Sequence, residues 1–137
     1  MKLILFRRLC LLATLVALCV IVLGAWVRLG DAGLGCPDWP GCYGHLTVGQ
    51  AVENADVANA AFPERPLEPD KALKEMIHRY VASGLGLLVI AIAVVAWRNR
   101  RDRAQPMRLP GVLVALVVFQ GLLGMWTVTL LLKPLIV

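Results

Sequence analysis

The chain has 137 residues, of which 59% are hydrophobic and 17% are charged, and its formal net charge is +5. Soluble domains have about 45–50% apolar and about 25% charged residues. The chain departs from both values at once, which excludes a disordered protein and argues against an ordinary soluble domain, and its length allows one domain at most.

Three uncharged apolar stretches divide the chain, at residues 9–27, 80–97 and 109–132. A membrane-spanning helix needs about 20 mostly apolar residues, with about 18 as a working threshold. All three stretches reach it, the second with the help of Arg79 and Arg98, whose long side chains can reach the interface from its two ends. We therefore predict an all-α integral membrane bundle, a single membrane domain over residues 1–137 with transmembrane helices at about 9–29, 77–97 and 109–132.

The first stretch has an alternative explanation as a secretory signal peptide, with Lys2, Arg7 and Arg8 as its charged region. The apolar part of a signal peptide is about 7–15 residues long and is followed by small residues at a cleavage site. This stretch is longer, and it runs into Ala25-Trp26-Val27-Arg28 without an A-x-A pattern. An uncleaved anchor helix is therefore the better interpretation.

Charges are sorted between the two sides of the predicted helices. The N-terminus and the loop at 98–108 hold eight basic residues and one acid, whereas segment 28–79 holds eight of the nine acids. Because short loops rich in Lys and Arg remain in the cytoplasm, we expect a cytoplasmic N-terminus, an outer, periplasmic loop at 30–76 and a cytoplasmic loop at 98–108. This explains the basic charge without a nucleic-acid partner. Without an Arg- and Ser-rich amphipathic leader, a bacterial inner membrane is expected rather than a mitochondrial one.

The four cysteines fall into two groups. Cys10 and Cys19 lie in the first apolar stretch, where small buried side chains are the simplest interpretation. Cys36 and Cys42 lie in the outer loop, on the oxidising side of the membrane, where disulfides persist. A zinc site would need more ligands than the nearby His45, and a redox-active pair is more typically C-x-x-C. A structural or mildly redox-active disulfide is therefore favoured.

A short polar motif, Glu75-x-x-His78-Arg79, stands where the outer loop enters the second helix. Residues three apart share a helix face. An imidazole there suits a haem iron ligand, the carboxylate could orient it or move protons, and the guanidinium could pair with a haem propionate. From spacing alone, polar residues at the start of a helix are the simpler interpretation. A di-iron bundle would need a second copy of the motif.

Four sequence blocks follow one another along the chain. They are Gly24-Ala25-Trp26-Val27-Arg28-Leu29, then Gly33-Leu34-Gly35-Cys36-Pro37-Asp38-Trp39-Pro40-Gly41-Cys42-Tyr43-Gly44, then Glu75-x-x-His78-Arg79, and then Gln120-Gly121-x-x-Gly124-x-x-Thr127-Val128. In this order and spacing they resemble the amino-terminal half of the haem A synthase family. The resemblance runs essentially from end to end of the chain, and the four blocks together are specific although each one alone would be weak.

The resemblance implies an integral membrane protein of eight helices in two similar four-helix halves. Such a protein oxidises the C8 methyl of haem O to the formyl group of haem A, through hydroxylated intermediates, for cytochrome oxidase biogenesis. It implies a haem b cofactor in the carboxyl-terminal half and haem O as the substrate in the amino-terminal half. His78 matches an iron ligand, Glu75 matches a carboxylate one turn before it, and Cys36 and Cys42 match an outer-loop pair that forms a disulfide.

The match also implies that the chain stops before the family's next histidine, with three of the eight helices. We expect an amino-terminal fragment or a truncated gene product, inactive alone, whose parent works with the lipid membrane, haem O synthase and oxidase assembly factors. Two alternatives stay open. A non-catalytic haem-binding membrane carrier or assembly factor would share His78, and a membrane thiol–disulfide protein would use Cys36 and Cys42.

Overall fold

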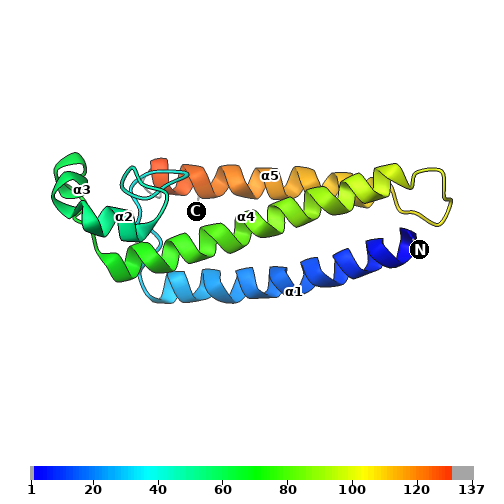
Figure 1. Cartoon of the computed structure of the whole chain (residues 1–137), viewed down its shortest axis with the longest axis horizontal. Coiled ribbons are helices and arrows are strands. Elements are labelled where there is room, and N and C mark those ends of the chain that lie inside the picture. Colours follow the sequence, from blue (N-terminus) through cyan, green and yellow to red (C-terminus); the bar gives the residue numbers. More distant parts are fainter. Residues whose placement is uncertain (1, 131–137) are drawn as a thin grey trace.

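The computed structural model describes residues 2–130, and within this range the regular structure is entirely helical. The helices are α1 (Lys2–Leu29), α2 (Val48–Glu53), α3 (Ala55–Ala61), α4 (Pro69–Arg98) and α5 (Arg108–Thr129), as Figure 1 shows. Of these, α1, α4 and α5 are long and apolar enough to cross a membrane. The predicted all-α fold with three candidate membrane spans is therefore confirmed.

The bounds of the long helices differ from those expected from the apolar stretches. Helix α1 begins at Lys2 rather than near residue 9, and α4 begins at Pro69, inside the segment predicted to be loop. Proline suits the first turn of a helix, because the N–H that it lacks would have no partner there, and Asp70 places a negative charge at the same helix end. The predicted end of the third helix at residue 132 lies outside the described residues.

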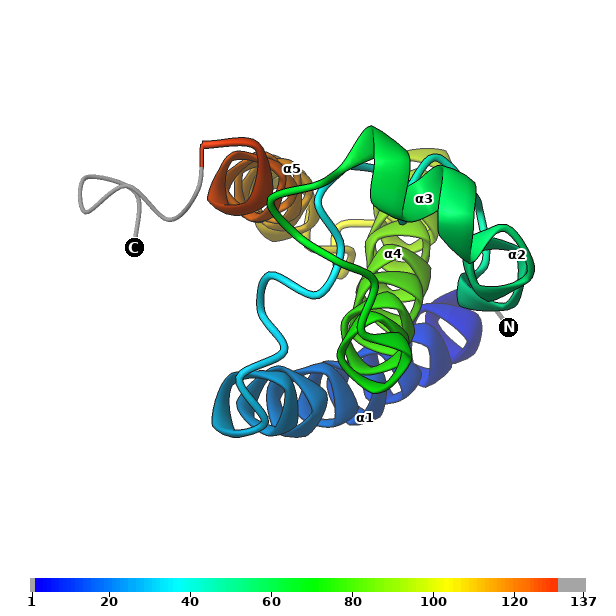
Figure 2. The same cartoon turned by 90° about the vertical axis from the view of Figure 1, so that its left-hand side faces the viewer.

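The three long helices form an open arrangement with α4 in the middle. Helices α1 and α5 each pack against α4 but not against each other. Seen end-on in Figure 2, residues 30–45 run between the ends of α1 and α5 on one side of α4. The N-terminus and the link from α4 to α5 lie together at the opposite end of the molecule (Figure 1).

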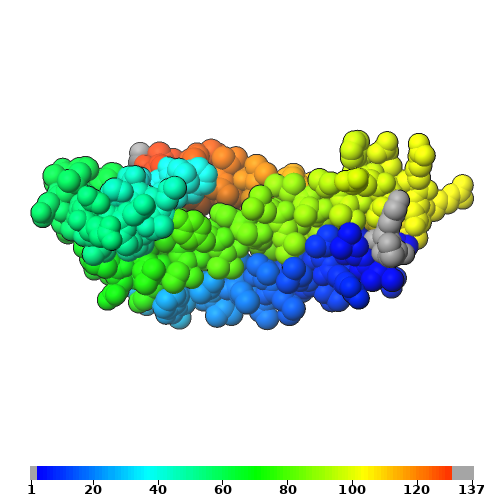
Figure 3. Space-filling model, in the orientation of Figure 1, coloured from blue at the N-terminus to red at the C-terminus, as the bar shows by residue number. Residues whose placement is uncertain are grey.

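Residues 30–68, which we call the cap, cover one end of the helices (Figure 3). The cap contains α2 and α3, and α2 begins with a capping box in which the side chains of Thr47 and Gln50 bond each other's backbone N–H. A cluster of buried residues joins the cap to the first turns of α4. Its members are Cys36, Cys42, Tyr43, Val48, Ala51, Ala58, Ala72 and Met76.

Most large side chains on the membrane helices point away from the rest of the chain. On α1, for example, Leu11, Leu15 and Leu18 are all more than half exposed. Lipid tails are as apolar as leucine, so such a surface is stable in a membrane and would not be stable in water. The cap is therefore the most compactly packed part of the described chain, and it fixes the residues around the start of α4.

Candidate functional site

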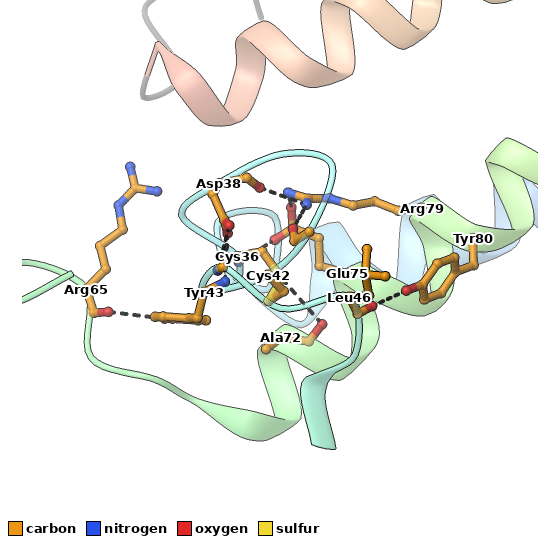
Figure 4. The surroundings of a disulfide bond; sticks show 12 residues. Cys36, Asp38, Cys42, Tyr43, Leu46, Arg65, Ala72, Glu75, Arg79 and Tyr80 are labelled. Carbon is orange, nitrogen blue, oxygen red and sulfur yellow. Dashed lines mark hydrogen bonds and ion pairs between the residues drawn. A yellow bond between two sulfur atoms is a disulfide. The ribbon is translucent and has the colours of Figure 1, made fainter. Parts of the chain in front are cut away.

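The cap is built around a disulfide between Cys36 and Cys42 (Figure 4). Both cysteines are completely buried. Beside the disulfide, the backbones of Cys42 and His45 form a short bridge, with N–O distances of 2.8 and 3.1 Å. The side chain of His45 is partly exposed, and the described residues contain no group of three or more His, Cys, Asp or Glu side chains that could hold a metal ion.

The disulfide loop is bound to α4 by two charged side chains of the motif singled out above. The backbone N–H of Cys36 donates to Glu75 Oε2 at 2.9 Å. Arg79 Nη1 donates to the carbonyl oxygens of Asp38 and Gly41, at 2.9 and 2.7 Å. The two side chains also form an ion pair, with 2.5 Å between Arg79 Nη2 and Glu75 Oε1. Figure 4 shows both reaching from α4 to the loop.

A glycine allows the loop to approach α4 so closely. A Cβ on Gly35 would lie 2.6 Å from the backbone carbonyl carbon of Lys71 and 2.7 Å from its oxygen. Real Cβ atoms do not come this near to backbone atoms, so only glycine fits without a shift. The neighbouring Cys36 N–H is thereby brought within hydrogen-bonding distance of Glu75.

Tyr43 connects the disulfide loop to the rest of the cap. Its backbone has a positive φ of 55°, and the carboxylate of Asp38 accepts its N–H at 2.7 Å, which stabilises this turn. The hydroxyl donates to the carbonyl oxygens of Arg65 and Pro66, at 3.1 and 3.2 Å, and the ring meets Phe62 edge to face. Burial raises the pKa of Tyr43, so the ring carries its proton throughout the neutral range.

His78 lies on a different side of α4, where α1 packs. A Cβ placed on Gly24 of α1 would be 3.2 Å from His78 Cε1, 3.7 Å from Nδ1 and 3.8 Å from Nε2. The imidazole therefore lies across the backbone of α1. Its Nδ1 is buried and has no hydrogen-bond partner among the described residues.

The structure thus assigns the predicted site residues to two places. Glu75 and Arg79 lie together under the disulfide loop, while His78 faces α1. The carboxylate was expected to orient His78 or to move protons. Its hydrogen bonds instead join it to the loop and to Arg79. The guanidinium expected to meet a propionate bonds Glu75 and two loop carbonyls.

Sequence reasoning missed the contact of Gly24 with His78 and that of Gly35 with α4. Both glycines are part of the blocks quoted above, but a glycine in a membrane helix is ordinarily explained by helix packing. The position of Gly24 in the sequence could have identified it. It lies near the end of α1 that is closest to the cap, and in a helical hairpin this end lies beside the start of α4. The distance itself could not be predicted, because it depends on how the two helices cross.

The sequence of the chain is similar to those of known proteins. The sequence profile of a family described as "cytochrome oxidase assembly protein" matches residues 7–137. The chain is 52% identical to the "heme A synthase" of Shewanella oneidensis over 120 residues, which is 88% of this chain and 36% of the relative. It is 32% identical to that of Shouchella clausii over 120 residues, 86% of this chain and 34% of the relative.

A further relative has a different name. The "protoheme IX farnesyltransferase 1" of Natronomonas pharaonis is 35% identical over 94 residues, which is 68% of this chain and 16% of the relative. The chain spans about a third of the length of the heme A synthases of Shewanella oneidensis and Shouchella clausii. No solved structure matches it significantly.

Proposed function

The chain belongs to the cytochrome oxidase assembly protein family, and on this premise we propose that it forms the haem O-binding, amino-terminal part of a haem A synthase. The reaction is the oxidation of the C8 methyl of haem O to the formyl group of haem A. Haem O is the substrate, and His78 is the ligand of its iron. A haem b cofactor belongs to the carboxyl-terminal half of the enzyme.

The placement of His78 is the observation that carries this proposal. Its imidazole is half-buried at the cap end of α4, with the apolar length of the bundle beyond it. A porphyrin supplies the in-plane ligands of its iron, so one or two histidines suffice and no cluster of side chains is needed. The imidazole makes no hydrogen bond through its buried Nδ1 to any described residue, so the protein does not engage the ring as it does a structural histidine. The residues therefore fit a haem at this position.

The geometry supports positioning roles for Glu75 and Arg79 in place of direct contact with the reacting atoms. Both bind the disulfide loop, and both come from the turn of α4 that also carries His78. By holding the loop against α4, they would fix the first turns of this helix, from which His78 also projects. A propionate contact by Arg79 would require its guanidinium to give up one of the loop carbonyls.

We place the protein in a bacterial inner membrane, with the N-terminus in the cytoplasm and the cap outside. The excess of basic residues at the N-terminus and at 98–108 supports this orientation. The substrate is then bound near the outer surface of the membrane. The enzyme that makes haem O and the factors that assemble the oxidase are its expected partners.

The test is a visible absorption spectrum of the chain, purified in mild detergent from cells that make haem O. We expect a haem band in the parent and in His45→Ala, because His45 lies in the cap with its backbone paired to Cys42. We expect none in His78→Ala. A band that persists unchanged in His78→Ala, or a parent without any band, would overturn the proposal.

The two other candidate functions make different predictions. A non-catalytic haem carrier would hold haem through His78, but extracts of its membranes would contain haem O and no haem A. A thiol–disulfide protein would need an accessible cysteine pair. The complete burial of Cys36 and Cys42 weighs against that function and supports a structural disulfide.

A further inference from the structure

We propose that Gly24 is a positioning residue for the haem ligand: the absence of a side chain at this point of α1 sets the orientation of the His78 imidazole. The inference rests on the proposed function, because it concerns how the ligand of that site is held. It adds a residue on a different helix from the ligand, and it gives α1 a role in the site beyond anchoring the chain.

The imidazole of His78 packs closely against α1 at Gly24. Ring carbon Cε1 lies 3.2 Å from the position that a Cβ on Gly24 would take, and both ring nitrogens lie within 4 Å of it. Carbon atoms pack best at about 3.5–4.0 Å. A Cβ at position 24 would therefore make a tighter contact with the ring than most real Cβ atoms make, and with alanine the imidazole or the helix would have to shift by a few tenths of an ångström.

No hydrogen bond to a described residue orients the His78 ring through its Nδ1. A histidine that binds a metal almost always donates its other ring N–H to a carboxylate, a carbonyl or water, which fixes the tautomer and the rotation of the ring. In this structure Nδ1 of His78 is buried without such a partner among residues 2–130. The carboxylate one turn away, Glu75, is occupied by the Cys36 N–H and by Arg79. The close contact with Gly24 is thus a restraint on the ring that does not depend on a hydrogen bond.

Gly24 differs from other glycines of the membrane helices in how close its neighbours lie. A Cβ on Gly84, Gly121 or Gly124 would meet no described atom within 4 Å. A Cβ on Gly86 would meet only a Val117 methyl at 3.5 Å, an ordinary contact. Close approach to a functional side chain is thus a property of Gly24 and not of helical glycines in general.

The experiment compares Gly24→Ala with Gly84→Ala, the same substitution on α4 at a position with open space. Alanine favours the helix over glycine at both positions, so neither change should break its helix. Each variant is purified with haem as above. The readouts are the visible and low-temperature EPR spectra of the haem, which report axial ligation, the midpoint potential, and the rate at which haem passes to apomyoglobin.

We expect Gly24→Ala to change the EPR spectrum and the midpoint potential and to release haem roughly tenfold faster, a change typical of a modest overpacking penalty. Gly84→Ala should match the parent in all readouts. Loss of haem in Gly24→Ala with a cap still resistant to protease would also support the inference. Parental spectra, potential and release rate would overturn it, and so would a cap that becomes protease-sensitive in Gly24→Ala alone, because the role would then be structural.

These outcomes separate the inference from the proposed function. If His78→Ala keeps the haem band, the proposed ligand is wrong, and the inference falls with it. If His78→Ala loses the band while Gly24→Ala behaves as the parent does, the ligand stands and only the positioning role of Gly24 is refuted.

Discussion

Replacing Glu75 with Gln should loosen the disulfide loop from α4. Glu75 accepts the Cys36 N–H and pairs with Arg79, which in turn holds the carbonyls of Asp38 and Gly41. Glutamine has nearly the same shape and can still accept one hydrogen bond. The substitution therefore removes the charge that Arg79 faces and leaves the packing almost unchanged.

The burial of the ion pair sets the size of the effect. The side chains of Arg79 and Glu75 are only 13% and 6% exposed. Breaking a buried pair by removing one charge costs about 3–5 kcal/mol, and a hydrogen bond to a charged group contributes about 1.5–3 kcal/mol. Because glutamine keeps one acceptor, we expect about 3 kcal/mol. This corresponds to roughly a hundredfold larger population of the undocked loop, since about 1.4 kcal/mol is a factor of ten.

The rate of disulfide reduction measures this population. Both sulfurs are inaccessible in the folded cap, so a water-soluble phosphine reduces the bond between Cys36 and Cys42 only when the loop opens. New thiols are trapped with a polymer-linked maleimide and counted by gel shift. Cys10 and Cys19, which are free, are replaced by alanine in every sample so that only the loop is observed. Reduction of the Glu75→Gln protein should be roughly a hundredfold faster than that of the parent.

Glu68→Gln is the matched control. Glu68 pairs with Lys71 at 3.0 Å, but its side chain is 60% exposed, and an exposed pair contributes at most about 1 kcal/mol. The control should therefore be reduced at nearly the parental rate. If Glu75→Gln is also reduced at that rate, the buried ion pair does not hold the loop, and the reasoning is refuted.

Two further changes test the cap. Gly35→Ala places a Cβ against the Lys71 backbone and should lower the stability of the cap by about 1–3 kcal/mol, which faster proteolysis of the cap would show. The control is Gly33→Ala, because a Cβ on Gly33 would meet no described atom within 4 Å, and it should be cleaved at the parental rate. Equal rates of proteolysis in the two variants would contradict the steric argument. Tyr43→Phe removes the hydroxyl that donates to Arg65 O and should lower cap stability by about 0.5–1.5 kcal/mol in thermal melting. Burial raises the pKa of Tyr43 above its usual 10.0, so the folded cap favours the protonated ring; this stabilisation is present at neutral pH and is lost as the pH rises through the raised pKa. The Phe variant should lack that alkaline loss, and a variant that keeps it would refute the assignment.

The existence of the membrane helices was predictable, because hydropathy alone decides it. Long apolar runs such as 109–132 have few stable conformations in a membrane other than a helix. The limits of the helices were less predictable. The apolar run at 80–97 gave no sign that α4 starts at Pro69, since a helix continues beyond the membrane wherever packing favours it, and here the cap packs against its first turns.

The pairing of Cys36 with Cys42 was also within reach of the sequence, because only a short segment separates them and their predicted compartment is oxidising. The partners of Glu75 and Arg79 were not. Both residues were recognised as one motif with His78, yet the neighbours His78 and Arg79 point about 100° apart around the helix, while Glu75 and Arg79, four residues apart, share the side that the loop covers. Which side of α4 the disulfide loop contacts depends on the path of the loop, and only the tertiary structure determines that path.

The sequence by itself therefore determined the class of the protein, its candidate membrane spans and its family, since these follow from hydropathy and from the order of residue blocks along the chain. The tertiary structure alone decided how the polar motif is divided, with Glu75 and Arg79 under the disulfide loop and His78 against Gly24. The physical reason is that these contacts join residues far apart in the chain. They depend on the crossing of α1 with α4 and on the close approach of the cap, which local patterns do not encode.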